Sequence, residues 1–185
     1  MPLNTVNIPN LLTLLRLCLV PVIIVMISSH AWLSAFLIFV IAGVTDAVDG
    51  FIARQFNQRT ELGAYLDPLA DKALLVSIYI TLAIVTVIPV WLAVIVVARD
   101  IMILGAIILS LLLNNPMTIE PLKISKANTF AQIAFAAMML GTLAFGISSL
   151  LIYDIMTISV AILTIGSMGA YLSLWLRHMT SQAGQ

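Results

Sequence analysis

Five of the eight acidic residues of this 185-residue chain fall in one stretch, from position 44 to position 72. They are Asp46, Asp49, Glu61, Asp67 and Asp71. Only 9% of all residues are charged, so the density of carboxylates is local. An acidic side chain placed deep in a membrane costs about 2.5 to 3.5 kcal/mol even on lenient insertion scales. A carboxylate cluster in such an apolar chain therefore indicates a functional site.

The spacing of four of these aspartates predicts a shared pocket. Residues three and four apart lie on one face of a helix, so Asp46 shares a face with Asp49, and Asp67 shares a face with Asp71. The residues between positions 52 and 63 suffice for a turn that places the two helix ends side by side. Four carboxylates in one pocket need a counter-charge. The sequence thus predicts that two helix tips share bound cations.

Hard divalent cations are the natural ligands of such oxygen atoms, and we expect two ions of Mg²⁺ or Mn²⁺. Two adjacent metals can hold both the attacking and the leaving oxygen of a phosphate displacement. Gly50, Ala53 and Gly63 have little or no side chain, which lets a diphosphate or nucleotide lie against the backbone. A solvated connection between helices is the plainer alternative, but it does not explain aspartates in phase on two helices.

The rest of the chain must form the helices that hold these tips. The chain is 62% apolar, with a mean hydropathy of +1.16, which excludes an ordinary soluble protein. Six apolar runs approach or exceed the length needed to cross a bilayer. They predict an all-α membrane protein with six transmembrane helices in a single domain over 1–185, preceded by a short interfacial segment at 4–10. The expected helices are 11–27, 32–52, 64–87, 89–113, 127–147 and 151–176.

The basic residues predict the orientation. One set of connections holds Arg54, Arg59, Lys123, Lys126 and Arg177, whereas the connections at the opposite ends hold no Lys or Arg. By the positive-inside rule the first set is cytoplasmic, so both termini and the acidic stretch face the cytoplasm. We expect no cleaved signal peptide, because the N-terminus lacks a basic region and a small-residue cleavage pattern. Such a chain suits a bacterial inner membrane, and the sequence leaves an organellar membrane open.

The spacing Asp46-x2-Asp49-Gly50-x2-Ala53-Arg54-x8-Gly63-x3-Asp67-x3-Asp71 resembles the complete signature of the CDP-alcohol phosphatidyltransferase family. The resemblance extends from Asn7-Ile8-Pro9-Asn10-Leu11-Leu12-Thr13 to about Gln132. It implies six helices around a polar cavity that faces the cytoplasm, and a homodimer. It also implies a metal-dependent enzyme of the bilayer that binds CDP-diacylglycerol and an alcohol acceptor and releases CMP. No nucleic-acid partner is expected, because the net charge is zero.

Carried onto this sequence, the resemblance assigns roles to the signature residues. Asp46, Asp49, Asp67 and Asp71 would hold the two metals. Asp71 would also be the catalytic base that takes the proton of the acceptor hydroxyl. The cytidine diphosphate group would be bound by Asp49, Gly50, Ala53, Arg54 and Gly63.

Charges outside the signature indicate an acceptor site. Arg16, Arg99 and Lys126 would be costly if they faced lipid, so we expect them to face the cavity and bind an acceptor phosphate. Asp100 would orient one of these cations. Neighbours on a helix point about 100° apart, so we do not expect Arg99 and Asp100 to pair with each other. Internal salt bridges between helices are the alternative for each residue.

The resemblance outside the signature favours acceptors that contain glycerol. Relatives that use glycerol 3-phosphate typically carry Lys where Asn128 stands and Glu where Asp100 stands. We therefore favour phosphatidylglycerol as the acceptor, which gives cardiolipin, over glycerol 3-phosphate, which gives phosphatidylglycerophosphate. A divalent-cation transporter is the rival of another class, although carboxylates at a helix end and the lack of an inverted repeat argue against it.

Overall fold

The computed structural model describes residues 8–55, 61–112, 122–147 and 149–182, and within α2 and α3 the side chains of residues 47 and 49–68 lie outside the description. The described residues form six helices and no strand. The helices are α1 (Ile8–Ser28), α2 (Trp32–Gln55), α3 (Glu61–Ile84), α4 (Val90–Leu112), α5 (Lys123–Phe145) and α6 (Leu150–Gln182). Each corresponds to one predicted run, so the all-helical prediction is confirmed. Ile8 to Asn10 of the predicted interfacial segment belong to α1.

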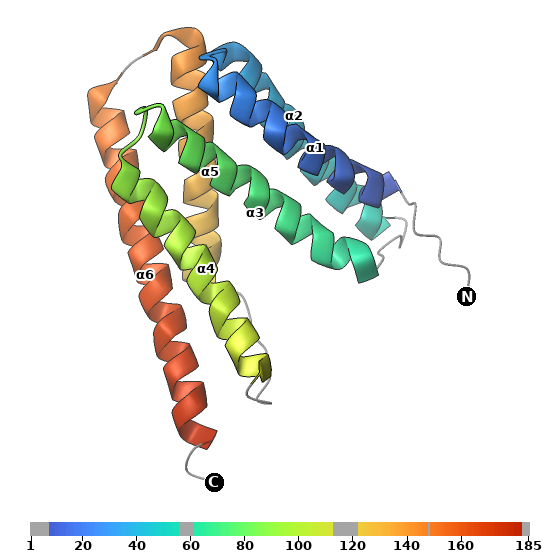
Figure 1. The fold of residues 1–185 in the computed structure, drawn as a ribbon, viewed down its shortest axis with the longest axis vertical. Helices are drawn as coiled ribbons and strands as arrows, with labels where there is room; N and C mark the ends of the chain where they lie inside the picture. The colour runs from blue at the N-terminus through green and yellow to red at the C-terminus, as the bar shows by residue number, and fades with distance from the viewer. Residues whose placement is uncertain (1–7, 56–60, 113–121, 148, 183–185) are drawn as a thin grey trace. The chain divides into compact units, whose positions relative to one another are not determined.

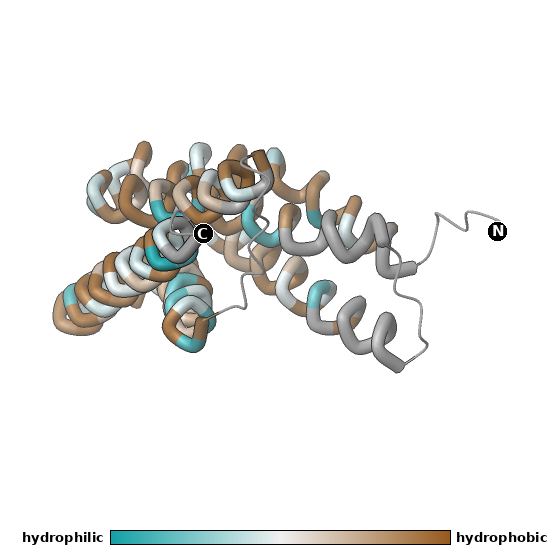
Figure 2. The backbone as a smooth tube through the Cα atoms, turned by 90° about the horizontal axis from the view of Figure 1, so that it is seen from below, coloured by the Kyte–Doolittle hydropathy of each residue, from teal (hydrophilic) through white to brown (hydrophobic). Residues whose placement is uncertain are grey.

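The surface of the helices is that of an integral membrane protein. Most residues along the helices are apolar (Figure 2), and many large apolar side chains are exposed on α1, α2, α4, α5 and α6. Exposed apolar area of this extent marks contact with lipid. Within the described residues four stretches are long and apolar enough to span a bilayer, namely Leu11–Ser28, Val90–Ser110, Lys123–Phe145 and Leu150–His178. The described part of α2 contributes a shorter apolar stretch, Trp32–Asp46.

Two helices end in a left-handed residue that is not glycine. His30 has a φ of 57° and Thr86 a φ of 60°. At α1 the His30 amide donates to the Ile27 carbonyl at 3.0 Å, and the Ala31 amide donates to the Met26 carbonyl at 2.9 Å. Thr86 sits in the same pattern after α3. These paired bonds satisfy the last carbonyls of each helix, which offsets the cost of the left-handed backbone.

The described chain divides into two compact units. The first comprises residues 1–88 and 136–148. In it α1 packs against both α2 and α3, as Figure 1 shows. The core between these helices contains the fully buried side chains Ile23, Ile27, Ala35, Ala70 and Ile78. Because α1 contacts both partners, it can reach the ends of α2 and α3 that carry the acidic motif.

The second unit comprises residues 89–135 and 149–185. Here α4 packs against α6, and Leu92, Val96 and Val160 are buried. The first part of α5 belongs to this unit, and Gly166 of α6 accommodates the Ile124 side chain, since a Cβ at Gly166 would lie 3.1 Å from the Ile124 Cδ1. In this unit α6 therefore contacts both α4 and α5.

Candidate active site

A buried arginine joins the two halves of the acidic motif. The Nη1 of Arg16, on α1, lies 3.0 Å from an oxygen of Asp46 on α2. The same nitrogen donates a hydrogen bond to Asp71 on α3 at 2.5 Å. Both carboxylate oxygens are thus within bonding distance of one atom. These contacts bring together one aspartate from each predicted helix tip.

The burial of these three groups is unequal. The Arg16 side chain is 1% exposed, whereas those of Asp46 and Asp71 are each 46% exposed. The guanidinium therefore lies beneath the carboxylates, and the carboxylates remain open to solvent or ligand. Exposed aspartate oxygens that converge from two helices fit a hard divalent cation. The donor set is thus compatible with the Mg²⁺ or Mn²⁺ that the sequence predicts.

The remaining signature positions are placed only by their backbone. Asp49, Gly50, Ala53 and Arg54 fall in the last turns of α2, and Gly63 and Asp67 fall in the first turns of α3. Their side chains lie outside the described part of the structure. Among the side chains that are described, no three or more His, Cys, Asp or Glu residues form a group able to hold a metal. The four-aspartate site stays a prediction.

Arg99 lies at the centre of a polar cluster in the second unit. The residue is 3% exposed, and its guanidinium contacts an oxygen of Asp100 at 2.5 Å. It also donates to the Ser167 hydroxyl at 3.0 and 3.2 Å and to the Ser125 hydroxyl. The Arg99 carbon Cζ lies 5.8 Å from the centre of the Tyr171 ring. These contacts tie α4 to α5 and α6.

The expectation that Arg99 and Asp100 do not pair is wrong. Their Cβ atoms diverge on the helix, but an arginine side chain has enough rotatable bonds to curl back to the next residue. Burial provides the reason, because an Arg99 charge in this apolar unit needs a nearby counter-charge. The role of Asp100 in orienting a cation for an acceptor stays a prediction.

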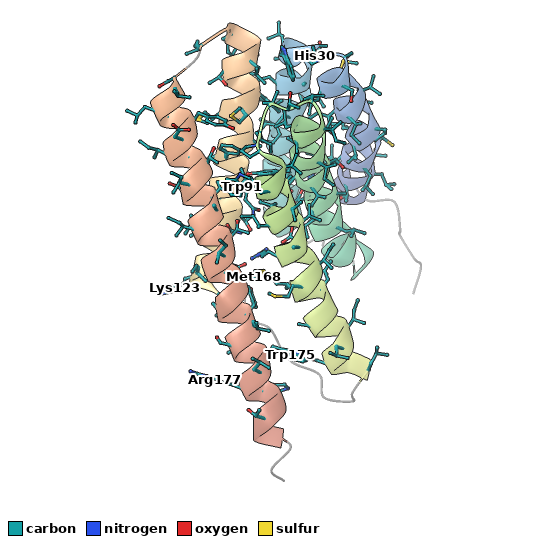
Figure 3. All side chains as sticks on the ribbon, turned by 60° about the vertical axis from the view of Figure 1, so that its left-hand side comes forward. His30, Trp91, Lys123, Met168, Trp175 and Arg177 are labelled. Carbon is teal, nitrogen blue, oxygen red and sulfur yellow. The ribbon has the colours of Figure 1, made fainter. Side chains whose placement is uncertain are left out.

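A second polar group runs between α5 and α6. The Thr164 hydroxyl donates to the side-chain oxygen Oδ1 of Asn128 at 2.9 Å, and the side-chain Nε2 of Gln132 donates to the same hydroxyl at 3.3 Å. All three side chains are buried, and the Asn128 Nδ2 has no hydrogen-bond partner. Lys126, by contrast, is exposed. Lys123 begins α5, as Figure 3 shows.

An apolar pocket of about 170 Å³ lies on α4 and α6, lined by Met102, Ile103, Ala106, Leu109, Tyr171, Leu172 and Trp175. The indole nitrogen of Trp175 donates to the Ser110 hydroxyl at 3.1 Å, and Figure 3 shows the residue on α6. The lining suits hydrocarbon and offers little to a nucleotide.

The chain belongs to the CDP-alcohol phosphatidyltransferase family, whose model matches residues 6–175. The match extends through both units and includes every signature position. The resemblance inferred from the acidic motif is therefore confirmed.

Curated relatives fall in two groups within this family. The chain is 35% identical over 184 residues to a cardiolipin synthase (CMP-forming) of Rattus norvegicus, covering 91% of this chain and 61% of that protein. The corresponding protein of Homo sapiens is 34% identical with the same coverage. A CDP-diacylglycerol–glycerol-3-phosphate 3-phosphatidyltransferase of Bacillus subtilis (strain 168) is 32% identical over 159 residues, or 77% of this chain and 81% of the relative. The chain thus spans about three fifths of the length of the rat and human relatives.

Sequence reasoning missed several partners of the buried cations. It placed Arg16 toward a polar cavity, with a salt bridge between helices as the alternative, but did not name Asp46 and Asp71 as its partners. The signal was present, because an arginine in an apolar run must find an acid and the acidic stretch was the largest source. Ser125 and Ser167 gave a weaker signal, since isolated serines are common in membrane helices.

Proposed function

We propose that this chain transfers the phosphatidyl group of CDP-diacylglycerol to an acceptor that contains glycerol. The acceptor hydroxyl oxygen forms a bond to the phosphorus that carries diacylglycerol, and the bond from that phosphorus to CMP breaks. The observation that supports the proposal most is the convergence of Asp46 and Asp71 at the Arg16 guanidinium. It joins the two halves of the family signature in one place.

The roles of the residues follow from their chemistry. Asp46, Asp49, Asp67 and Asp71 would hold two divalent cations, Mg²⁺ or Mn²⁺, which when bound neutralise phosphate charge and orient oxygen atoms. Asp71 takes the proton that the acceptor hydroxyl loses, and its half-exposed carboxylate is accessible to a substrate. The cytidine diphosphate group would lie along Asp49, Gly50, Ala53, Arg54 and Gly63.

Phosphatidylglycerol is the favoured acceptor, with cardiolipin as the product. The rat and human relatives that are named cardiolipin synthases align with 91% of the chain. Asn128 is a neutral residue whose oxygen is engaged by Thr164, so this position adds no charge for a doubly charged phosphate. The similarity to the Bacillus subtilis relative supports glycerol 3-phosphate as the second candidate. No observation favours divalent-cation transport.

The acceptor phosphate would be bound by Arg99 and Lys126, with Arg16 as a third candidate. Lys126 is exposed and can meet a ligand directly. The donors of Arg99 are engaged by Asp100 and two serines, so an anion there would share the guanidinium with them. The contacts of Arg16 with two aspartates favour the different role developed below.

The proposal includes the setting of the enzyme. We propose a single domain with six transmembrane helices around a polar cavity, in a homodimer. The active site and both termini would face the cytoplasm, in a bacterial inner membrane. A family match that includes both units supports the single domain. Chemical labelling of single cysteines at Ser29 and Arg177, in a Cys18→Ser background, tests the orientation, because only the second should react from the cytoplasmic side.

Competition between acceptors tests the proposed function. Purified protein receives CDP-diacylglycerol and Mg²⁺ or Mn²⁺ together with equal amounts of phosphatidylglycerol and glycerol 3-phosphate, and the lipid products are identified by mass spectrometry. Cardiolipin as the main product is expected. Phosphatidylglycerophosphate would establish the second candidate, and absence of both products and of CMP would refute the proposed transfer.

A further inference from the structure

We propose that Arg16 is a built-in counter-ion of Asp46 and Asp71 that weakens the binding of divalent cations to these carboxylates. When no cation is bound, its charge holds α1, α2 and α3 together. The inference rests on the metal site of the proposed function. It extends the proposal about that site, because it assigns a role to a residue outside the family signature.

The contacts set up the opposition. The Arg16 Nη1 lies 3.0 Å from Asp46 Oδ1 and 2.5 Å from Asp71 Oδ1. Any cation that uses these carboxylates must lie close to the guanidinium, so the two positive charges repel each other. Salt in the surrounding water weakens this repulsion only slightly, because the arginine is buried.

The burial of Arg16 favours its position beside the two acids. The side chain is 1% exposed, so its guanidinium is shielded from water. Moving it away from both acids would separate a buried charge from the groups that compensate it, which is strongly unfavourable. The carboxylates, at 46% exposure, remain open on the other side. A divalent cation therefore approaches from the open side and binds against a fixed opposing charge.

This arrangement has two consequences for the protein. Arg16 neutralises part of the negative charge, so the ends of α2 and α3 stay close to α1 when no cation occupies the carboxylates. It also lowers the affinity for the cation. Both effects depend on the charge of residue 16, and they can be measured without substrate turnover.

Binding of Mn²⁺ tests the inference directly. The affinity of the full purified chain in detergent is measured from the free Mn²⁺ signal in electron paramagnetic resonance. Arg16→Gln removes the charge but keeps an amide donor, and we expect it to bind Mn²⁺ at least about fivefold more tightly, the lower end of typical coupling between sites. Arg16→Lys keeps the charge and should remain within about twofold of the wild type.

The unfolding temperature supplies the second readout. Arg16→Gln should unfold at a lower temperature than the wild type in a chelator and gain more from added Mn²⁺. A variant that is folded only with Mn²⁺ would support the inference equally. Arg16→Met is the second neutral variant if Arg16→Gln cannot be purified.

The outcomes separate the inference from the proposed function. Unchanged or weaker Mn²⁺ binding by the neutral variants would overturn the inference and leave the metal site intact. Absence of Mn²⁺ binding by the wild type would overturn the metal site and the inference together. If the wild type and the variants bind Mn²⁺ as expected but the wild type releases no CMP, the result would count against the proposed function alone.

Discussion

Replacing Arg99 by methionine should destabilise the second unit strongly. The substitution keeps an apolar stem and removes the guanidinium that contacts Asp100, Ser125 and Ser167. Asp100 is 8% exposed, so the loss of its cation leaves a poorly solvated carboxylate. The two serine hydroxyls lose a charged donor at the same time.

The expected magnitude follows from these contacts. Removing one member of a buried ion pair costs about 3 to 5 kcal/mol. In a chain of this length each kcal/mol lowers the unfolding temperature by roughly 2 to 4 °C. Arg99→Met should therefore unfold about 6 to 20 °C below the wild type. Removing both charges in Arg99→Met/Asp100→Leu should recover much of this loss, because no carboxylate then remains without its cation.

Thermal unfolding in detergent, followed by circular dichroism, measures these differences. Lys126→Met is the matched control, because Lys126 is a cation in the same unit but is exposed. Its free energy of unfolding should change by no more than about 0.5 kcal/mol. An Arg99→Met protein that unfolds within about 2 °C of the wild type would refute the buried pairing.

Three further predictions concern stability and use the same unfolding assay. Gly146→Ala should cost about 1 kcal/mol because Gly146 has a φ of +66°, while Gly169→Ala, in an open helical position, should gain up to about 0.5 to 1 kcal/mol; equal effects would contradict this. Thr86→Gly should raise the free energy of unfolding by about 0.5 to 1 kcal/mol, because glycine adopts the left-handed conformation of Thr86 without strain. A lower free energy of unfolding would count against the left-handed backbone at this residue. Thr164→Val removes a hydroxyl that links Asn128 and Gln132, so it should cost about 1 to 3 kcal/mol, and a neutral effect would argue against that buried link.

The helices were predictable because long apolar runs in a membrane leave the backbone few alternatives. The runs 11–27 and 32–52 became α1 (Ile8–Ser28) and α2 (Trp32–Gln55) with only small extensions. Their exact ends were less predictable. His30 and Thr86 adopt the left-handed conformation that glycine normally supplies, so the sequence carried no strong stop signal there.

Within the site, spacing and burial differed in what they could predict. The spacing of the aspartates and the connection between positions 52 and 63 predicted that two helix ends lie together, and Asp46 and Asp71 from these two helices both contact Arg16. The pairing of Arg99 with Asp100 was missed because helix geometry fixes the direction of Cβ but leaves a long side chain free to bend. The acceptor was harder still, since recognition of a headgroup depends on side-chain positions that spacing alone does not give.

Metal-dependent release of CMP by the wild type and by Asp71→Asn is the most direct test of the central claim. Purified protein is incubated with CDP-diacylglycerol, phosphatidylglycerol and Mg²⁺ or Mn²⁺, and CMP is quantified by chromatography. We expect release by the wild type, none after chelation, and a rate at least about a hundredfold lower for Asp71→Asn. Wild-type rates for Asp71→Asn, or undiminished release in the chelator, would contradict the account.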